Sequence, residues 1–431
     1  MFRFAVVSLA LVAVLAVGVS AATPGGSAPK AAGGTQWVNG PSTDPSYFPI
    51  GVWLQDPGRA AEYKALGVNF YVGLWNGPTE QQLAQLKAAG MNVICTLNDV
   101  GMRHVNDKNI IAWMHGDEPD NCQPLEGYWK NDLAAIKKAW PDMADYTAER
   151  WASTFGTNGA PVPPAWIEKD YNEISRKDPT RPVYLNLGVG VAYDSLAGRG
   201  IRSQHPEDYY GYCKGCDIVS YDVYPERQRG DRRGKLWHVP KGVVRLRKYC
   251  GDEKIVWNII EGSRSSATGN KPTAESLRSE AWMSIIHGSR GIIYFVHLFQ
   301  PAFVEAGVMG DAELMQGYKS LHAEIRSLAP AINSPNVEGT VTVTSSVPGS
   351  SDLTAEGLEP VATMVKKQGG ALYIFSVRME GTPATGTFKV QGLPASARAQ
   401  VLGENRTVPV NGGTFTDEFG AYQVHLYKIN L

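Results

Sequence analysis

Short apolar runs alternate with amphipathic stretches between about residue 50 and residue 330. The runs are rich in Val, Ile, Tyr and Trp, which is typical of strands buried on both faces of a sheet. The predicted strands cover residues 50–54, 70–75, 92–97, 110–114, 182–186, 217–222, 255–260 and 291–296. Eight successive β/α units predict a parallel sheet, and eight such strands close into a (β/α)8 TIM barrel over residues 35–334.

Helix signals fall between these runs. Thr79 suits an N-cap and Gly90 a helix stop, so a helix is expected between them. Further helices are predicted over residues 59–66, 164–176, 273–287 and 312–328, with a long loop-rich insertion at 120–164. A doubly wound open sheet is the competing fold. It would carry a Gly-rich phosphate loop after the first strand, whereas residues 55–59 read Gln-Asp-Pro-Gly-Arg, so the barrel is favoured.

The pattern of hydrophobic and polar residues changes at about residue 335. Short alternating runs at 341–344, 362–367, 371–377, 387–390 and 422–427 predict strands, and Gly369-Gly370 and Asn411-Gly412-Gly413 predict hairpin turns. Residues 335–431 are therefore expected to form a small antiparallel β-sandwich. Such a unit serves either as an accessory domain packed on the barrel or as a carbohydrate-binding module. The absence of an aromatic row on one face favours the former.

The first residues have the features of an export signal. Arg3 precedes an apolar stretch, and small residues follow at Ser20-Ala21-Ala22, which predicts a cleaved signal peptide over residues 1–22 and a secreted protein. A single membrane anchor is the alternative. Residues 23–34 are rich in Gly, Ala and Pro and read as a flexible linker. No later stretch is long and apolar enough to span a membrane.

Charge and motifs exclude several classes of function. The formal net charge is −1, which provides no electrostatic footprint for a nucleic acid or an acidic membrane surface. Phosphate-binding, dinucleotide-binding and serine-hydrolase motifs do not occur in the sequence, so no cofactor is expected.

Five cysteines remain after the signal peptide, and they predict a disulfide. Cys213 and Cys216 form a close pair, and either could instead bridge to Cys250 or Cys122. A zinc site would need a second pair or matching histidines, so no metal is expected. Cys95, inside an apolar strand, is the expected buried thiol.

Two glutamates end predicted barrel strands. Glu118 follows the fourth strand in Gly116-Asp117-Glu118-Pro119, and Glu261 ends the seventh in Ile260-Glu261-Gly262. Barrel enzymes carry their functional groups at these carboxyl ends. A pair of carboxyl groups across one bond is the requirement of glycoside hydrolysis, one as acid and one as nucleophile. Ion pairing with loop arginines such as Arg264 is the structural alternative.

This arrangement resembles clan A of the glycoside hydrolases, in which the acid/base lies at strand four and the nucleophile at strand seven. The resemblance covers residues 35–333, and it implies Glu118 as acid/base and Glu261 as nucleophile of a retaining enzyme. Many members read Asn-Glu-Pro where this chain has Asp117-Glu118-Pro119. Asp117 can accept a hydrogen bond from a sugar hydroxyl but cannot donate an amide proton.

The resemblance also suggests substrate contacts. Tyr224, or failing that Tyr221, lies where relatives carry a tyrosine that hydrogen-bonds the nucleophile, and His297 lies where many carry an aromatic platform. Other strand-end candidates for lining the sugar site, each of which could equally serve packing, are Trp53, Trp75 and Asn186.

The sequence thus predicts a secreted, retaining glycoside hydrolase that cleaves β-linked poly- or oligosaccharides by double displacement. A non-catalytic carbohydrate-binding protein on a degenerate barrel is the main alternative, and a barrel lyase is another. The sugar, the linkage and the oligomeric state are not encoded in any recognisable motif.

Overall fold

The computed structural model describes residues 37–431, except 124–132, 146, 148–158, 229, 265–269 and 395–396. The predicted signal peptide and linker, and part of the predicted insertion, lie outside these residues. Within the described chain, no helix has the length and apolar character needed to cross a bilayer.

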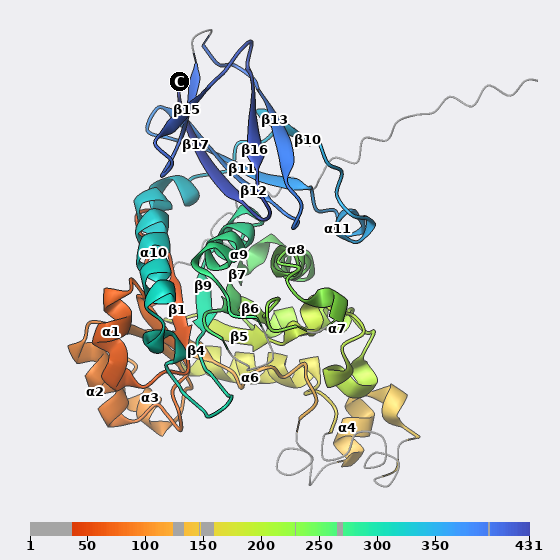
Figure 1. The fold of residues 1–431 in the computed structure, drawn as a ribbon. Helices are drawn as coiled ribbons and strands as arrows, with labels where there is room; N and C mark the ends of the chain where they lie inside the picture. The colour runs from red at the N-terminus through yellow and green to blue at the C-terminus, as the bar shows by residue number, and fades with distance from the viewer. Residues whose placement is uncertain are drawn as a thin grey trace, which may run out of the picture.

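A closed parallel barrel forms the larger part of the fold (Figure 1). Its strands pair in the order β5-β4-β3-β2-β1-β9-β8-β6, and pairing of β5 with β6 closes the ring. The seventh barrel strand is split at Trp257 into β7 and β8, both of which pair with β6. The predicted barrel is confirmed. Its strands are β1 (Ile50–Trp53), β2 (Phe70–Val72), β3 (Asn92–Cys95), β4 (Ile110–Met114), β5 (Val183–Leu187), β6 (Ile218–Val223), β7 (Ile255–Val256), β8 (Asn258–Glu261) and β9 (Ile292–Phe295).

Helices surround the barrel, and the N-cap predicted at Thr79 is confirmed. Thr79 caps α2 in a reciprocal capping box with Gln82, and Thr273 caps α9 in the same way with Ser276. The last helix, α10, continues past the predicted end at residue 328 because its final turn is buried against the molecule. The helices of this part are α1 (Ala60–Ala65), α2 (Glu80–Ala88), α3 (Asp99–Arg103), α4 (Leu133–Ala139), α6 (Pro164–Lys177), α7 (Asp208–Tyr212), α8 (His238–Cys250), α9 (Ala274–Ile286) and α10 (Ala312–Ile332).

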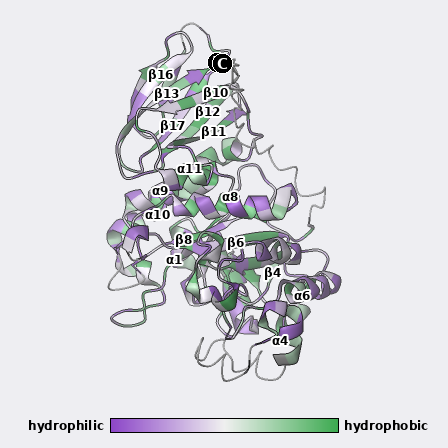
Figure 2. Ribbon diagram, turned by 90° about the vertical axis from the view of Figure 1, so that its right-hand side faces the viewer, coloured by the Kyte–Doolittle hydropathy of each residue, from purple (hydrophilic) through white to green (hydrophobic). Residues whose placement is uncertain are grey.

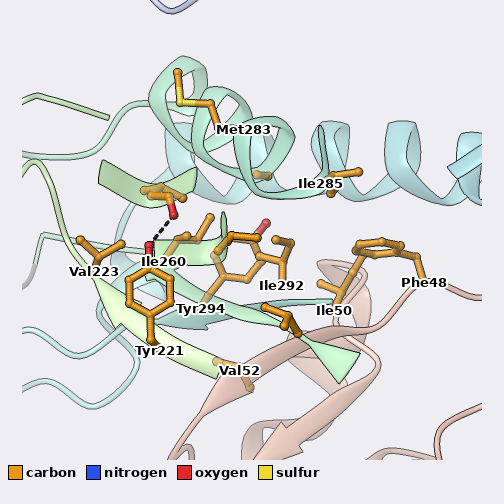
Figure 3. Packing of buried hydrophobic residues seen from close by; sticks show 14 of the residues in the cluster. Phe48, Ile50, Val52, Tyr221, Val223, Ile260, Met283, Ile285, Ile292 and Tyr294 are labelled. Carbon is orange, nitrogen blue, oxygen red and sulfur yellow. Dashed lines mark hydrogen bonds between the residues drawn. The ribbon is translucent and has the colours of Figure 1, made fainter. Parts of the chain in front are cut away.

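Alternation along each strand divides the core into two layers. Outward side chains such as Ile260, Ile292 and Tyr294 belong to one buried cluster with Ile285 of α9, which lies over them (Figure 3). Inward side chains, including Phe70, Tyr184 and Trp257, fill the barrel itself. The barrel strands are accordingly mostly hydrophobic in Figure 2, whereas α8 and α10 carry both polar and apolar residues.

Two antiparallel sheets follow the barrel, as predicted. One has the order β10-β13-β16 and the other β11-β12-β17-β14-β15. Gly369 and Gly370 form the two-residue turn between β11 and β12, both with positive φ. The domain bounds at residues 334 and 335 stay a prediction. The strands are β10 (Val341–Ser345), β11 (Val361–Gln368), β12 (Ala371–Arg378), β13 (Ala384–Val390), β14 (Arg398–Val401), β15 (Arg406–Pro409), β16 (Thr414–Phe419) and β17 (Val424–Asn430), and a short helix, α11 (Ser351–Ala355), precedes β11.

The sandwich packs on the outer surface of α8, α9 and α10 (Figure 1). Phe375 of β12 lies against Trp282 of α9, with ring centroids 5.1 Å apart. Arg278 of α9 pairs with Glu324 and donates to the backbone oxygen of Val424 at 3.0 Å. The loop between β6 and α8 also contacts this C-terminal unit, because Lys235 pairs with Asp352 of α11 at 3.7 Å.

The disulfide joins Cys213 to Cys250, with Cα atoms 5.2 Å apart. This pairing corrects the close Cys213–Cys216 pair and selects one of the alternatives that the sequence left open. Cys216 is a buried free thiol at the end of the short turn after Cys213, and Cys95 is buried as predicted.

Candidate active site

Glu118 lies just beyond the carboxyl end of β4 in a strained backbone conformation. Its φ is 43°, in the left-handed region that non-glycine residues rarely adopt. The Glu118 N–H donates to the carbonyl of Asn186 at 3.2 Å, which ties the loop to the end of β5. Its Oε2 accepts from Nδ2 of Asn121 at 2.7 Å. Strain of this kind is concentrated at functional sites.

The carboxyl group in contact with Glu118 is that of Asp222, near the end of β6. The negative charge of Asp222, followed by burial, raises the pKa of Glu118 far above its ordinary value. Burial raises the pKa of Asp222 only to about 6, because its contacts with Glu118 and Tyr224 favour the ionised form. At neutral pH, Glu118 is therefore the protonated member of the pair and Asp222 the ionised one.

A hydrogen-bonded chain of polar groups crosses the mouth beside this pair. Ser220 donates to Oδ1 of Asn186 at 2.7 Å, and Nδ2 of Asn186 donates to Oδ1 of Asp117 at 3.0 Å. Asp117 is solvent-exposed, yet it is surrounded closely enough that desolvation, and then the charge of Glu118, raise its pKa to about 7. Two sequence candidates, Asp117 and Asn186, are thus brought together next to Glu118.

Glu261 ends β8, and strands β5 and β6 lie between β4 and β8 in the barrel. Its side chain is 1% exposed, and Oε1 accepts from the backbone N–H of Glu226 at 2.5 Å. Burial raises the pKa of Glu261 to about 8, an effect that the N–H of Glu226 opposes. The carboxyl group of Glu261 therefore contacts the backbone of the loop after β6, whereas the carboxyl group of Glu118 contacts that of Asp222.

The aromatic and histidine candidates differ in how far their side chains are buried. Tyr224 is half-buried within hydrogen-bonding range of Asp222, and its contact with the nucleophile, which the resemblance implies, stays a prediction. Trp53 is buried inside the barrel, so it serves packing in this structure. His297 is 2% exposed, and its Nε2 contacts the carbonyl of Leu54 at 3.0 Å. Trp75 presents its ring to solvent, with 47% exposure, and donates from Nε1 to Oε1 of Glu305 at 2.6 Å.

Sequence reasoning missed Asp222 and Ser220. The signal was present, because both alternate with the inward-facing Ile218 on the sixth strand and therefore point into the barrel. An acid near the end of that strand follows the same pattern that identified Glu118. Among the described residues, no group of three or more His, Cys, Asp or Glu side chains has the arrangement of a metal site.

Comparison with solved structures places the fold. A catalytic mutant of Gan42B, a GH42 β-galactosidase from G. stearothermophilus, is similar over 90% of this chain and 98% of its own, with 9% identity and a TM-score of 0.52. Gan42B itself is similar over 92% and 100%, with 9% identity and a TM-score of 0.51. No protein-family model matches the sequence, and no curated protein matches it. At these identities the likeness shows a common fold alone.

Proposed function

We propose that this chain is a secreted, retaining glycoside hydrolase that acts on β-linked oligo- or polysaccharides. The observation that carries the proposal is the contact between the carboxyl groups of Glu118 and Asp222 at the mouth of the barrel, which raises the pKa of Glu118. A carboxylic acid whose surroundings keep it protonated is what acid-assisted glycoside cleavage needs, and the nearby charge of Asp222 does this for Glu118. The resemblance to clan A and the fold shared with a β-galactosidase support the same class.

In this mechanism Glu118 transfers its proton to the glycosidic oxygen while the carboxylate of Glu261 attacks the anomeric carbon. The bond to the leaving sugar breaks, and a glycosyl ester forms on Glu261. Glu118, now ionised, then removes a proton from a water molecule that displaces Glu261 and restores both groups. Asp117 and Asn186, joined by their hydrogen bond, are placed to accept from and donate to sugar hydroxyls.

The experiment is a screen of the purified protein against β-glucan, xylan, galactomannan, galactan, starch and aryl glycosides. Hydrolysis by the wild type, lost in Glu118→Gln and in Glu261→Ala, is the expected result. Azide should restore turnover in Glu261→Ala by forming a glycosyl azide, and NMR should show that the first product keeps the anomeric configuration. Azide rescue of Asp222→Ala instead would transfer the nucleophile role to Asp222. Unimpaired turnover by Glu261→Ala would overturn its assignment.

Secretion is tested by expressing the full chain. Recovery outside the cell membrane, with a new N-terminus near Ala22, is expected. Retention of the intact chain in the membrane would favour the anchor.

One observation favours a second candidate, a non-catalytic carbohydrate-binding protein. Glu261 is buried and its pKa is raised to about 8, so a substantial fraction is neutral, and a neutral carboxylic acid is a poor nucleophile. This candidate predicts saturable binding to one of the screened glycans without release of reducing ends.

A further inference from the structure

The turn that follows Glu118 is held to its surroundings at several points. The carbonyl oxygen of Glu118 accepts from the backbone N–H of Asn121 at 3.1 Å. Asp120 is fully buried, and its Oδ1 accepts from the backbone N–H of Gly188 at 2.8 Å. Its Oδ2 accepts from the hydroxyl of Tyr209 at 2.9 Å. These bonds form a fixed frame that maintains the positive φ of Glu118.

Asn121 holds one oxygen of the Glu118 carboxyl group from this frame. Its Nδ2 donates to Oε2 of Glu118 at 2.7 Å, whereas its Oδ1 is buried and has no partner within the described structure. A carboxylic acid has one oxygen that carries the proton and one that only accepts. Because Oε2 receives the N–H of Asn121, the proton of Glu118 belongs on Oε1. Stability alone does not favour an asparagine here, because a buried unpaired oxygen is costly.

A glycine leaves room for the Asn121 amide. A Cβ atom on Gly188 would lie 2.6 Å from Nδ2 of Asn121, closer than real side chains approach. Gly188 has φ −77° and ψ 175°, a conformation that any residue adopts. The backbone therefore does not require glycine at this position, and the missing side chain matters for the space that it gives the amide.

The charges around Glu118 act against its ionised form, and Asn121 acts for it. The ionisable groups that interact with Glu118 lie on β6, on the loop after β6 and on its own loop, and they are Asp222, Tyr224, Asp117 and Asp120. The hydrogen bond from Asn121 lowers the pKa of Glu118, because it favours the carboxylate. Asn121 is thus placed to stabilise the charge that remains once Glu118 has given up its proton.

We propose that Asn121 is a positioning residue for the acid/base, which fixes the Glu118 carboxyl group so that Oε1 carries the transferred proton while Oε2 stays bound to the protein. This inference rests on the proposed function and deepens it. In the first step the O–H bond of Glu118 breaks, the proton bonds to the glycosidic oxygen, and the electron pair of the glycosidic bond leaves with that oxygen as Glu261 bonds to the anomeric carbon. In the second step a proton of water returns to Oε1.

Three variants separate positioning from folding, and circular dichroism should show that all three fold. Asn121→Leu replaces the amide by an apolar group of the same branched shape. Gly188→Ala keeps Asn121 but pushes its amide away from Glu118. Gly198→Ala is the matched control, because a Cβ atom there would lie 3.8 Å from Oδ1 of the same amide, which is an ordinary contact.

The first measurement is kcat/KM for two aryl glycosides of one sugar. A phenyl leaving group needs the proton of the acid, whereas a dinitrophenyl leaving group departs without it. Asn121→Leu and Gly188→Ala should lose at least about tenfold on the phenyl glycoside and keep the wild-type value on the dinitrophenyl glycoside. Gly198→Ala should match the wild type on both. Equal losses on the two substrates would show a merely structural role and overturn the proposal.

The second measurement is the pKa of Glu118 itself, which does not depend on turnover. NMR of protein labelled at the glutamate carboxyl carbons follows the titration, and Glu118→Gln identifies the signal by its absence. Loss of the Nδ2–H donor in Asn121→Leu should raise the pKa of Glu118 by about one pH unit. An unchanged pKa would overturn the proposal. A lowered pKa would also overturn it, because the amide would then accept the proton of Glu118 rather than donate to Oε2.

The failures of the two proposals are distinguishable. A raised pKa of Glu118 in Asn121→Leu, without hydrolysis of any substrate by the wild type, would support the placement of the proton and refute the enzyme. Hydrolysis that is indifferent to Asn121→Leu and to Gly188→Ala would refute the positioning role alone.

Discussion

Replacing Asp222 by Asn tests whether the charge of Asp222 keeps Glu118 protonated. Asp222→Asn keeps the size of the side chain and removes the negative charge that does most to raise the pKa of Glu118. Two unit charges about 4 Å apart interact by about 4 kcal/mol at an effective dielectric constant near 20. At about 1.36 kcal/mol per pKa unit, the pKa of Glu118 should fall by about three units. Burial, the second cause, remains in the variant.

The sign of the effect follows from the role of Glu118. A general acid must be protonated, so activity is lost as the pH rises through its pKa. The high-pH limb of kcat/KM should therefore move to lower pH in Asp222→Asn. The low-pH limb, set by ionisation of Glu261, whose pKa burial raises, should move much less.

The assay measures kcat/KM for a nitrophenyl glycoside from pH 4 to pH 11. The released nitrophenol is quantified at one fixed pH after the reaction is quenched. Asp107→Asn is the matched control, because it also removes the charge of an aspartate. Asp107 forms a salt bridge with Lys87 and precedes β4, whereas Glu118 follows the other end of that strand. Its pH profile should match that of the wild type. A high-pH limb that stays in place in Asp222→Asn would refute the reasoning that Asp222 holds the proton on Glu118.

Three further predictions concern stability. Glu280 of α9 is fully buried and both its carboxyl oxygens are without a partner in the described structure, so Glu280→Met should raise the melting temperature. Burial raises the pKa of Glu280, so the wild type loses stability as the pH rises above the ordinary glutamate range. The gain should thus be larger at pH 8 than at pH 4, and a gain independent of pH would contradict this account. Replacing both Cys213 and Cys250 by Ser opens a loop with a sequence separation of 37, and urea unfolding should show a loss of about 4 kcal/mol; no loss would contradict the pairing. Arg278→Leu breaks the bond to Val424 and should lower the temperature at which the sandwich separates from the barrel, measured by calorimetry, whereas an unchanged trace would show that apolar packing alone holds them.

The barrel was predictable because its strands are apolar on both faces and its helices carry local caps. Thr79 and Thr273 specify helix starts through their own backbone contacts, which need no tertiary information. Glu118 was identifiable because a carboxyl group ends an apolar run. The alternation of Ile218, Ser220 and Asp222 would have added Asp222 by the same logic.

Other features depend on tertiary contacts. Strands β14, β15 and β16 were missed because exposed polar residues interrupt the apolar pattern of each strand. The choice of Cys250 over Cys216 as the partner of Cys213 depends on how α8 packs, which spacing does not reveal. The charge state of Glu118 required knowledge of which carboxyl group lies against it.

The attachment of the sandwich along α8, α9 and α10 has a consequence for how this protein could be rebuilt. Apolar residues of the barrel helices and of β11, β12 and β17 belong to one continuous cluster, so a truncated barrel would expose Trp282 and its neighbours and would tend to aggregate. A chimera that exchanges the sandwich must therefore supply a matching apolar face toward α9 and α10.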